Sequence, residues 1–340
     1  MQFDLAIIGF GNVGQGLAEI LATKHDLLRD RYDANIRIVA VCDLYKGSVA
    51  NPDGIDPANL LAHVREHGDL QSFDAPNRGW DATETIANSG ANVLVELAFT
   101  DLETGEPAVS HIRQALEAGM HVSTTNKGPA ALHFPGLLEL SAKHGGKIGV
   151  EGTVMSGTPT LALGMNSLLA AGITRIQGIL NGTTNYILGE MEKGADYADA
   201  LADAQAKGFA EADPTGDVDG HDAAAKVVIL ANLMMGQSMT MNDVDCTGIS
   251  NISSADVSTA AADSKRWKLI GTVEMVDGNV VGLVKPVSVD ADHPLYGITG
   301  ATNAVTYSTD LLGDVTLIGP GAGRMETGYA IIGDILSFSR

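Results

Sequence analysis

Hydrophobic residues in the first part of the chain fall into two kinds of stretch that follow one another. Short unbroken apolar runs are typical of strands buried on both faces, and longer stretches with apolar residues every three or four positions are typical of helices packed on a core. The strands predicted in this way are 5–8, 36–42, 93–95, 121–125 and 147–150. The predicted helices are 14–28, 107–118 and 129–144. Residues 43–81 hold many Gly, Pro and Asp residues, so we expect an insertion outside the sheet, with a short helix near 60–67.

This alternation of strands and helices predicts an α/β fold with a doubly wound parallel sheet. The pattern changes after about residue 150, where strands are expected at 173–180, 273–276 and 280–284 and helices at 185–193 and 222–235. Asp277-Gly278-Asn279 lies between two of these strands and predicts a hairpin turn. A chain of 340 residues suits two domains. We expect one domain at 1–149 and an α+β domain at 150–323, with a last helix at 324–340 that packs back on the first domain.

The charge of the chain restricts its partners. It has 21 Lys and Arg against 42 Asp and Glu, a formal net charge of −21. Such a surface repels phosphate groups, so nucleic acids and anionic membranes are not expected as partners. The acidic excess fits either adaptation to salt or a need for solubility, and the charge does not decide between them. Cys42 and Cys246 form neither a disulfide framework nor a zinc-ligand set, which favours the cytoplasm.

The first candidate site is the glycine-rich segment Gly9-Phe10-Gly11-Asn12-Val13-Gly14. It fits the GxGxxG pattern, follows a predicted strand and opens a predicted helix, which is the context in which this pattern binds dinucleotides. Gly9 permits the tight turn, Gly11 lets the pyrophosphate approach the backbone, and Gly14 lets the helix pack on the strand. The N-terminus of the helix supplies N–H donors. The first domain is therefore predicted to be Rossmann-like and to bind NAD or NADP.

Asp43 ends the second predicted strand. An acidic side chain in this place can bind the 2′-hydroxyl of the adenosine ribose and favour NAD. Lys46 lies three residues further on, and its charge suits the 2′-phosphate of NADP. Capping of a turn is another explanation of Asp43, so the sequence leaves the preference between NAD and NADP open.

The second candidate site is the acidic segment that leads into the predicted helix 222–235. Asp222 and Lys226 are four residues apart and share one helix face. An exposed ion pair at a helix start would explain this spacing as well, but apolar residues continue close to the same face. The acidic residues that precede the helix are Glu211, Asp213, Asp217 and Asp219. Acids that converge on a lysine suit recognition of an ammonium group together with proton transfer.

The third candidate is Lys127, which follows the predicted strand 121–125. Ligands bind at the carboxyl ends of strands in doubly wound sheets, although a solvated turn lysine would occupy the same place. The sequence lacks the motifs of a serine hydrolase and of a metal site. There is no GxSxG segment for a hydrolase nucleophile, and the nine histidines show no tight metal-ligand spacing.

Taken in chain order, these motifs resemble homoserine dehydrogenase over nearly the whole chain. The glycine-rich segment is shared by many dehydrogenases, whereas NGTTNYIL (181–188) and KGFAEADPTGDVDGHDAAAK (207–226) are far more specific. The other matching segments are LETGEP (102–107), TTNKGP (124–129), EGTVMSGTP (151–159), HPL (293–295) and GPGAG (319–323).

The resemblance implies an oxidoreductase that interconverts L-homoserine and L-aspartate 4-semialdehyde with NAD(P), on the way to threonine and methionine. Carried over by position, Lys226 is the proton donor and acceptor for the substrate oxygen. Lys127 lies where coenzyme and substrate meet. Glu211 and Asp222 bind homoserine, and Asp217 is assigned to the same role from its place in the acidic segment.

The resemblance also implies the surroundings of this reaction. Gly208 and Gly323 line the coenzyme, and a structural sodium ion is held by Glu151, Val154, Ser156 and Thr158. The second domain is catalytic and forms a homodimer through a sheet built partly from segments near 150–159 and 295–323. The chain ends soon after the GPGAG segment, so we expect a short form without a regulatory C-terminal domain. Many relatives carry Thr-Pro where this chain has Ala98-Phe99, so no hydroxyl contact with the coenzyme is expected there.

Two other functions compete with this one. A phosphorylating semialdehyde dehydrogenase needs a thiol nucleophile, but Cys42 lies in the nucleotide-binding strand and Cys246 lies outside every matching segment. A non-catalytic NAD(P)-binding sensor or scaffold would not need a lysine on the helix of Asp222.

Overall fold

A computed structural model describes residues 1–339 and divides them into two compact units. Unit 1 comprises residues 1–157 and the segment from 323 onward, and unit 2 comprises residues 158–322. Arg340, the end of the predicted helix 324–340, lies outside the described residues. No helix within residues 1–339 is long and apolar enough to span a membrane. The catalytic and dimerisation roles expected of the second domain stay predictions.

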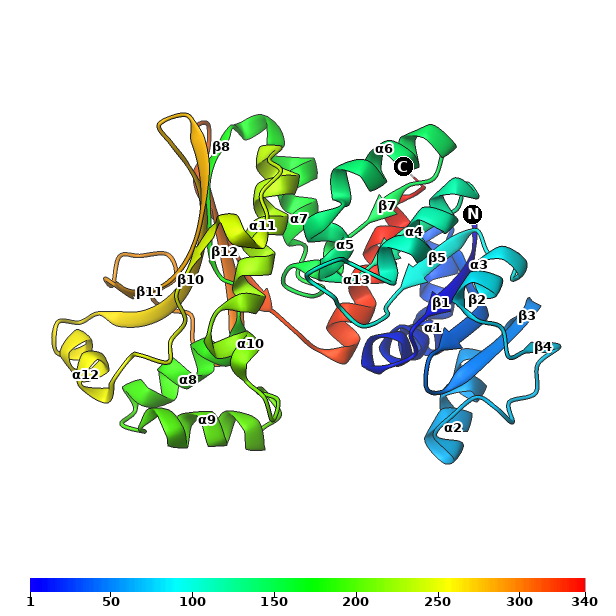
Figure 1. Ribbon diagram of the computed structural model, residues 1–340, viewed down its shortest axis with the longest axis horizontal. Coiled ribbons are helices and arrows are strands. Elements are labelled where there is room, and N and C mark those ends of the chain that lie inside the picture. The colour runs from blue at the N-terminus through cyan, green and yellow to red at the C-terminus, as the bar shows by residue number, and fades with distance from the viewer. Residues whose placement is uncertain (340) are drawn as a thin grey trace. The chain divides into compact units, whose positions relative to one another are not determined.

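Unit 1 is built on a seven-stranded sheet in the order β4-β3-β2-β1-β5-β6-β7 (Figure 1). The strands β2, β1, β5, β6 and β7 run parallel, as the alternating pattern predicts. The elements of unit 1 are β1 (Gln2–Ile8), α1 (Asn12–Tyr32), β2 (Asn35–Asp43), β3 (Gly47–Ile55), α2 (Pro57–His67), β4 (Asn77–Arg78), α3 (Ala82–Asn88), β5 (Val93–Glu96), α4 (Ala108–Glu117), β6 (His121–Thr124), α5 (Lys127–Leu132), α6 (Phe134–His144), β7 (Ile148–Gly149), the 3₁₀ turn η1 (Glu151–Thr153) and α13 (Arg324–Ser337).

The expected insertion at 43–81 is wrong in one respect. Its helix is present as α2, but β3 extends the sheet antiparallel to β2, with Val49 opposite Val41, and β4 pairs antiparallel with β3 at the edge. Val49 and Ala50 are buried there. The strand escaped prediction because Asn51-Pro52-Asp53 interrupts its apolar residues, and edge strands tolerate such residues.

The predicted helix 129–144 is two helices, α5 and α6, which meet at His133. Pro135 lies in the first turn of α6. A proline inside a continuous helix removes a hydrogen bond and clashes with the preceding turn, whereas the first turn accepts it. The proline pattern was therefore the signal for the break.

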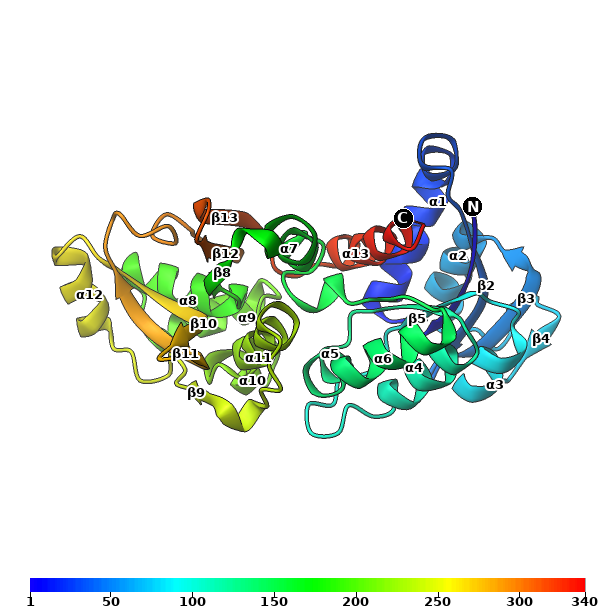
Figure 2. The same cartoon turned by 90° about the horizontal axis from the view of Figure 1, so that it is seen from above.

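Two apolar clusters cover the two faces of this sheet. One includes residues of α1, α2 and α13, and the other includes residues of α3, α4 and α6. The last helix, α13, runs beside α1, as Figure 2 shows. The approach is close, because a Cβ atom on Gly328 would stand 2.7 Å from the backbone nitrogen of Leu17. The end of the chain thus completes the core of unit 1.

Unit 2 contains a six-stranded sheet in the order β13-β12-β8-β10-β11-β9. The helices α8 and α11 pack on this sheet (Figure 1). The predicted hairpin is confirmed, with Asp277 and Gly278 in left-handed conformation at its turn. The elements of unit 2 are α7 (Thr160–Ala162), the π-helical η2 (Leu163–Leu168), η3 (Leu169–Ala171), β8 (Ile173–Ile179), α8 (Gly182–Glu192), α9 (Tyr197–Ala206), α10 (Thr215–Val218), α11 (His221–Met235), η4 (Met241–Asp243), β9 (Val244–Cys246), α12 (Ser254–Ala262), β10 (Arg266–Val276), β11 (Asn279–Val289), β12 (Thr302–Thr309) and β13 (Gly313–Pro320).

Candidate active site

The glycine-rich segment forms the turn between β1 and α1 in unit 1. Gly9 has φ 97°, and a Cβ atom there would overlap the backbone carbonyl of Leu97. A Cβ atom on Gly14 would stand 2.7 Å from the carbonyl oxygen of Gly9, whereas one on Gly11 would meet no atom within 4 Å. The outer two glycines are therefore required by the fold, and Gly11 faces open space. An open backbone position at the start of a long helix is what the prediction of a pyrophosphate site requires.

Asp43 lies beside this turn at the carboxyl end of β2. Its Oδ2 accepts the backbone N–H of Phe10 at 2.7 Å, and its Oδ1 accepts those of Tyr45 and Lys46 at 3.0 and 2.9 Å. Burial alone would raise the pKa of Asp43, but these three hydrogen bonds outweigh it and hold the pKa below its usual value. The Lys46 ammonium stands 4.0 Å from Oδ1. The structure thus places a carboxylate with a lowered pKa next to the glycine-rich turn.

Lys127 is the first residue of α5 and follows the carboxyl end of β6 in unit 1. Asn126 caps the helix by accepting the N–H of Gly128 at 3.0 Å. The lysine is thereby fixed at the edge of the sheet where ligands bind in this type of fold.

Lys226 is buried on α11 in unit 2, with 7% of its surface exposed. Its Nζ donates to Asp222 Oδ2 at 2.6 Å and to the carbonyl oxygen of Leu180 at 2.6 Å. An exposed surface pair would have left the ammonium in water. The burial instead makes the ammonium depend on these two oxygens for its position.

Asn181 joins this pair to a second acid. Its Nδ2 donates to Asp222 Oδ2 at 3.0 Å and to Asp217 Oδ1 at 2.7 Å. Burial raises the pKa of Asp217, the hydrogen bond from Asn181 opposes that shift, and the charge of Asp222 adds to it. We call Asn181, Asp217, Asp222 and Lys226 the lysine cluster. It brings two carboxylates and one ammonium together, which suits proton transfer on a cationic substrate.

The other acidic residues of the segment have different surroundings. Asp213 accepts the N–H of Thr215 at 3.1 Å, and Asp219 accepts the hydroxyl of Ser250 at 3.0 Å. Glu211 is exposed, and its backbone carbonyl accepts the side-chain amide of Gln205 at 3.0 Å. These three acids therefore have partners outside the lysine cluster, whereas Asp217 and Asp222 are joined by hydrogen bonds to Asn181.

The two further glycines expected to line the coenzyme both have positive φ. Gly208 follows α9 with φ 74°, and no atom lies within 4 Å of the position of its missing Cβ. Gly323 precedes α13 with φ 137°, and a Cβ there would overlap the carboxylate of Glu326. Other residues would be strained at both positions.

The residues expected to hold sodium lie around η1 and the turn after it. Glu151, Val154, Ser156 and Thr158 are buried. Met155 and Ser156 both have left-handed φ, at 58° and 55°, which bends the chain sharply between the candidate ligands. The carbonyl of Thr158 accepts the N–H of Thr160 at 2.6 Å. Within residues 1–339 no three His, Cys, Asp or Glu side chains are grouped as metal ligands, so any ion here must be held largely by carbonyl oxygens.

Asn181 was not predicted as a site residue. Its motif NGTTNYIL was recognised only as a segment that resembles the family, and no role was expected for its first residue. Asn181 also caps α8 by accepting the N–H of Thr184 at 2.9 Å. While its Oδ1 caps α8, its Nδ2 is free to donate to Asp217 and to Asp222 on α11. An asparagine at the start of a predicted helix is therefore the signal that could have indicated this role.

Comparison with known proteins agrees over both units. A model of the homoserine dehydrogenase family matches residues 159–336, and a model of the NAD-binding domain of homoserine dehydrogenase matches residues 9–151. The NAD(+)-dependent homoserine dehydrogenase of Pseudomonas canavaninivorans is 44% identical over 338 residues, which cover 98% of this chain and 96% of that protein.

Two solved structures have the same fold at full length. One is the crystal structure of an Archaeoglobus fulgidus protein assigned as a homoserine dehydrogenase. The match covers 98% of this chain and 98% of that chain, with 35% identity and a TM-score of 0.89. A hyperthermophilic archaeal homoserine dehydrogenase mutant in complex with NADPH covers 100% of this chain and 98% of that chain, with 28% identity and a TM-score of 0.85. The chain therefore belongs to the homoserine dehydrogenase family.

Proposed function

We propose that Lys226 carries the proton in the reaction of this chain, the NAD(P)-dependent interconversion of L-homoserine and L-aspartate 4-semialdehyde. The observation that supports this role is the burial of Lys226 against Asp222 and the carbonyl of Leu180. An ammonium group has three N–H bonds, and these two oxygens take two of them. The third is left for the oxygen of the substrate. A non-catalytic sensor of NAD(P) has no need of a buried lysine in this place.

The reaction moves one hydride and one proton. Bound NAD or NADP supplies or accepts the hydride. In the oxidation of homoserine, neutral Lys226 takes the proton of the hydroxyl group as the C–H bond breaks. In the reverse direction, the Lys226 ammonium returns this proton to the aldehyde oxygen. Asp222 and the Leu180 carbonyl hold Nζ in place in both directions, which is the condition for efficient proton transfer.

The substrate is bound by acidic residues in this proposal. Asp217 and Asp222 present carboxylate oxygens from the lysine cluster, and Glu211 lies on the segment just before it. These groups suit the ammonium and the hydroxyl group of homoserine. Lys127 is assigned to the contact with both substrate and coenzyme. Turnover of homoserine with each coenzyme, followed by the absorbance of the reduced coenzyme, tests the proposed function directly.

The coenzyme side of the proposal rests on unit 1. We assign the pyrophosphate to the turn made by Gly9, Phe10, Gly11, Asn12, Val13 and Gly14. We assign the adenosine ribose to Asp43 and further coenzyme contacts to Gly208 and Gly323. NAD is the expected coenzyme, because the ionised Asp43 accepts a hydroxyl group and repels a phosphate. The name of the Pseudomonas canavaninivorans relative points the same way.

The variant Asp43→Asn is expected to lower kcat/KM for NAD about tenfold and to raise it for NADP. The amide keeps one acceptor for the turn but loses the charge that binds the ribose and repels the 2′-phosphate. Steady-state kinetics with both coenzymes measures the change. Lys46→Gln serves as comparison, and its effect should fall on NADP alone. An unchanged ratio between the coenzymes in Asp43→Asn would rule out this role.

We also assign a structural sodium ion to Glu151 and the carbonyl oxygens of Val154, Ser156 and Thr158. Hard cations prefer such oxygen ligands, and a bound ion adds to the free energy of unfolding by about 2.7 kcal/mol at a hundred times its Kd. The melting temperature is expected to be higher in NaCl than in KCl of equal ionic strength. The variant Glu151→Gln should lose this difference. Equal melting temperatures of the unchanged protein in both salts would contradict the assignment.

We assign a homodimer to unit 2 and a cytoplasmic location to the protein. Exposed apolar side chains on and beside β12 and β13 support a contact between copies, since Leu311, Leu312 and Ile318 are 75%, 62% and 55% exposed. Free thiols support a reducing compartment, because Cys42 and Cys246 are unpaired.

A further inference from the structure

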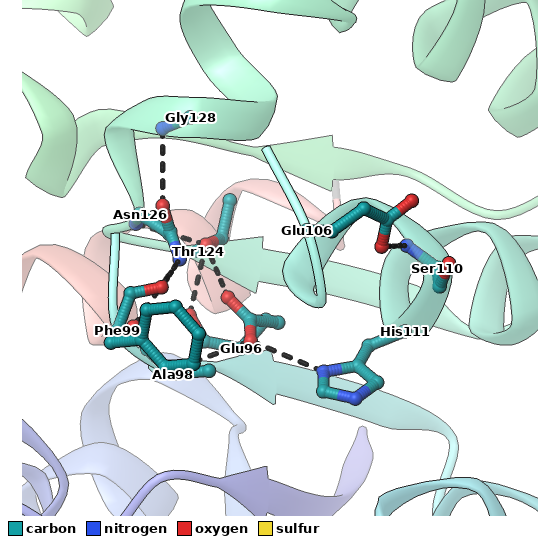
Figure 3. A network of polar contacts seen from close by, with 9 residues as sticks. All are labelled: Glu96, Ala98, Phe99, Glu106, Ser110, His111, Thr124, Asn126 and Gly128. Carbon is teal, nitrogen blue, oxygen red and sulfur yellow. Dashed lines mark hydrogen bonds and ion pairs between the residues drawn. The ribbon is translucent and has the colours of Figure 1, made fainter. Parts of the chain in front are cut away.

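We propose that Glu96 is a positioning residue, which holds the loop after β5 and the start of α5 in the arrangement that the reaction needs. Glu96 is the last residue of β5, and its side chain is fully buried. Figure 3 shows its carboxylate surrounded by groups from β6, α4 and its own loop. The part of the inference that concerns Lys127 rests on the proposed function.

The topology of the sheet shows which half of the coenzyme passes this point. β1 has β2 on one side and β5 on the other, so the chain reverses its direction of growth between β1 and β5. Ligands of doubly wound sheets bind at the carboxyl ends of the strands at such a reversal. Asp43 on β2 is assigned to the adenosine ribose and Gly11 to the pyrophosphate. The nicotinamide half of a bound coenzyme would therefore extend toward the carboxyl ends of β5 and β6.

The carboxylate of Glu96 binds three separate segments. Oε1 accepts the backbone N–H of Ala98 at 3.2 Å and lies 3.4 Å from Nδ1 of His111 on α4. Oε2 lies 3.4 Å from the hydroxyl oxygen of Thr124 on β6 and shares its proton with the nearer backbone carbonyl of Glu96. One buried side chain thus fixes the loop after β5 relative to the next strand and the next helix. The same loop borders the glycine-rich turn, since the N–H of Leu97 donates to the carbonyl of Ile8, the residue before Gly9, at 2.7 Å.

Hydrogen bonds of Thr124 and Asn126 connect Glu96 to the start of α5, where Lys127 lies. The Thr124 hydroxyl donates to the backbone carbonyl of Glu96 at 2.9 Å and accepts the N–H of Asn126 at 3.0 Å. The Asn126 amide donates to the carbonyls of Ala98 and Phe99 at 3.2 and 3.0 Å. Its oxygen accepts the N–H of Gly128 at 3.0 Å. Figure 3 shows these bonds of Asn126 and Gly128. Lys127 lies between these two residues in the chain, so its backbone position depends on the same hydrogen bonds.

Stability alone does not account for Glu96. The residues before it, Val93, Leu94 and Val95, form an apolar core strand, and an apolar residue would continue it without the cost of a buried carboxylate. The basic side chain paired with Glu96 is His111, which is itself 12% exposed. Glu96 is therefore better explained by its hydrogen bond to the loop after β5, which it holds in place, than by a contribution to core packing.

The test compares Glu96→Leu with two finer variants. Glu96→Leu removes every side-chain bond of the network and is expected to raise KM for the coenzyme at least tenfold and to lower kcat at least tenfold. Glu96→Gln keeps the acceptor for Ala98 and should restore part of both. Asn126→Asp keeps the helix cap but cannot donate to the carbonyls of Ala98 and Phe99, so it should show the same kinetic defect. Its melting temperature should fall as well, because a buried carboxylate oxygen would then face two carbonyl oxygens. Glu106→Gln is the matched control, because its exposed carboxylate caps the same helix α4 by accepting the N–H of Ser110 at 3.1 Å.

A lower melting temperature of Glu96→Leu and Asn126→Asp with unchanged KM and kcat would show a structural role and overturn the inference. If Glu96→Leu does not fold, Asn126→Asp and Glu96→Gln decide. Lys127→Ala, measured in parallel, separates the two proposals. Normal kinetics in Lys127→Ala would overturn the role of Lys127, whereas a raised coenzyme KM in the Glu96 variants would still support Glu96.

Discussion

Replacement of Lys226 by alanine is expected to lower kcat for homoserine about a thousandfold, with the affinity for the coenzyme unchanged. Proton transfer by a positioned side chain contributes about 10²- to 10⁴-fold to rate. The buried position of Lys226 excludes bulk water as a ready substitute, because its Nζ is enclosed by Asp222 and the carbonyl of Leu180. The measurement is steady-state turnover together with coenzyme titration by fluorescence.

The control for this variant is Lys193, a lysine in an exposed ion pair. Lys193 stands 2.8 Å from Glu190, and its side chain is 72% exposed, so Lys193→Ala should keep normal turnover. A small alkylamine added to Lys226→Ala should restore part of kcat, since it can occupy the space of the lost group and carry the proton. Turnover of Lys226→Ala near that of the unchanged protein would refute the proton-transfer role.

Replacement of Gly11 by alanine is expected to weaken coenzyme binding at least a hundredfold while the melting temperature without coenzyme stays the same. The added methyl group would meet no atom of the protein within 4 Å, so the fold accepts it. It would stand where the pyrophosphate must approach the backbone, and a bound ligand cannot move away from the N–H donors without losing them. Calorimetric titration with NAD and thermal unfolding measure the two effects.

Gly9→Ala gives the contrast within the same turn. Its φ of 97° and the nearby carbonyl of Leu97 both exclude a side chain, so this variant should lose stability before any question of binding arises. Tight coenzyme binding by Gly11→Ala would mean that the pyrophosphate lies elsewhere.

Much of unit 1 could be predicted because its strands are buried on both faces. The apolar runs of β1, β2 and β5 and the glycines between β1 and α1 are local patterns with one structural meaning. β3 lacks such a pattern, since it is an antiparallel strand near the edge whose second half is polar and contains Pro52. Its place in the sheet is set by pairing with β2, which no local pattern reveals.

Three members of the lysine cluster, Asp217, Asp222 and Lys226, could be singled out from the sequence, but a contact was predictable only for the two that share a helix. Asp222 and Lys226 are one turn apart on α11, and this spacing predicts their contact. Asn181 lies on another element, and its bridge between Asp217 and Asp222 arises because β8 ends beside α11. Glu96 was hidden in the same way, because at the end of an apolar strand it resembles the last residue before a turn. Such residues are defined by tertiary contacts rather than by spacing along the chain.

The hydrogen bonds of Asn181 have a consequence for electrostatic balance. An amide cannot take or release a proton at ordinary pH, so Asn181 holds Asp217 and Asp222 near each other without neutralising either. With both acids ionised, the cluster has negative charge in excess, by one unit while Lys226 is charged and by two while it is neutral. In the proposed mechanism, the ammonium group of homoserine supplies the missing positive charge. The substrate then serves as the counter-ion of its own binding site, and an uncharged alcohol of the same length would leave that site unbalanced.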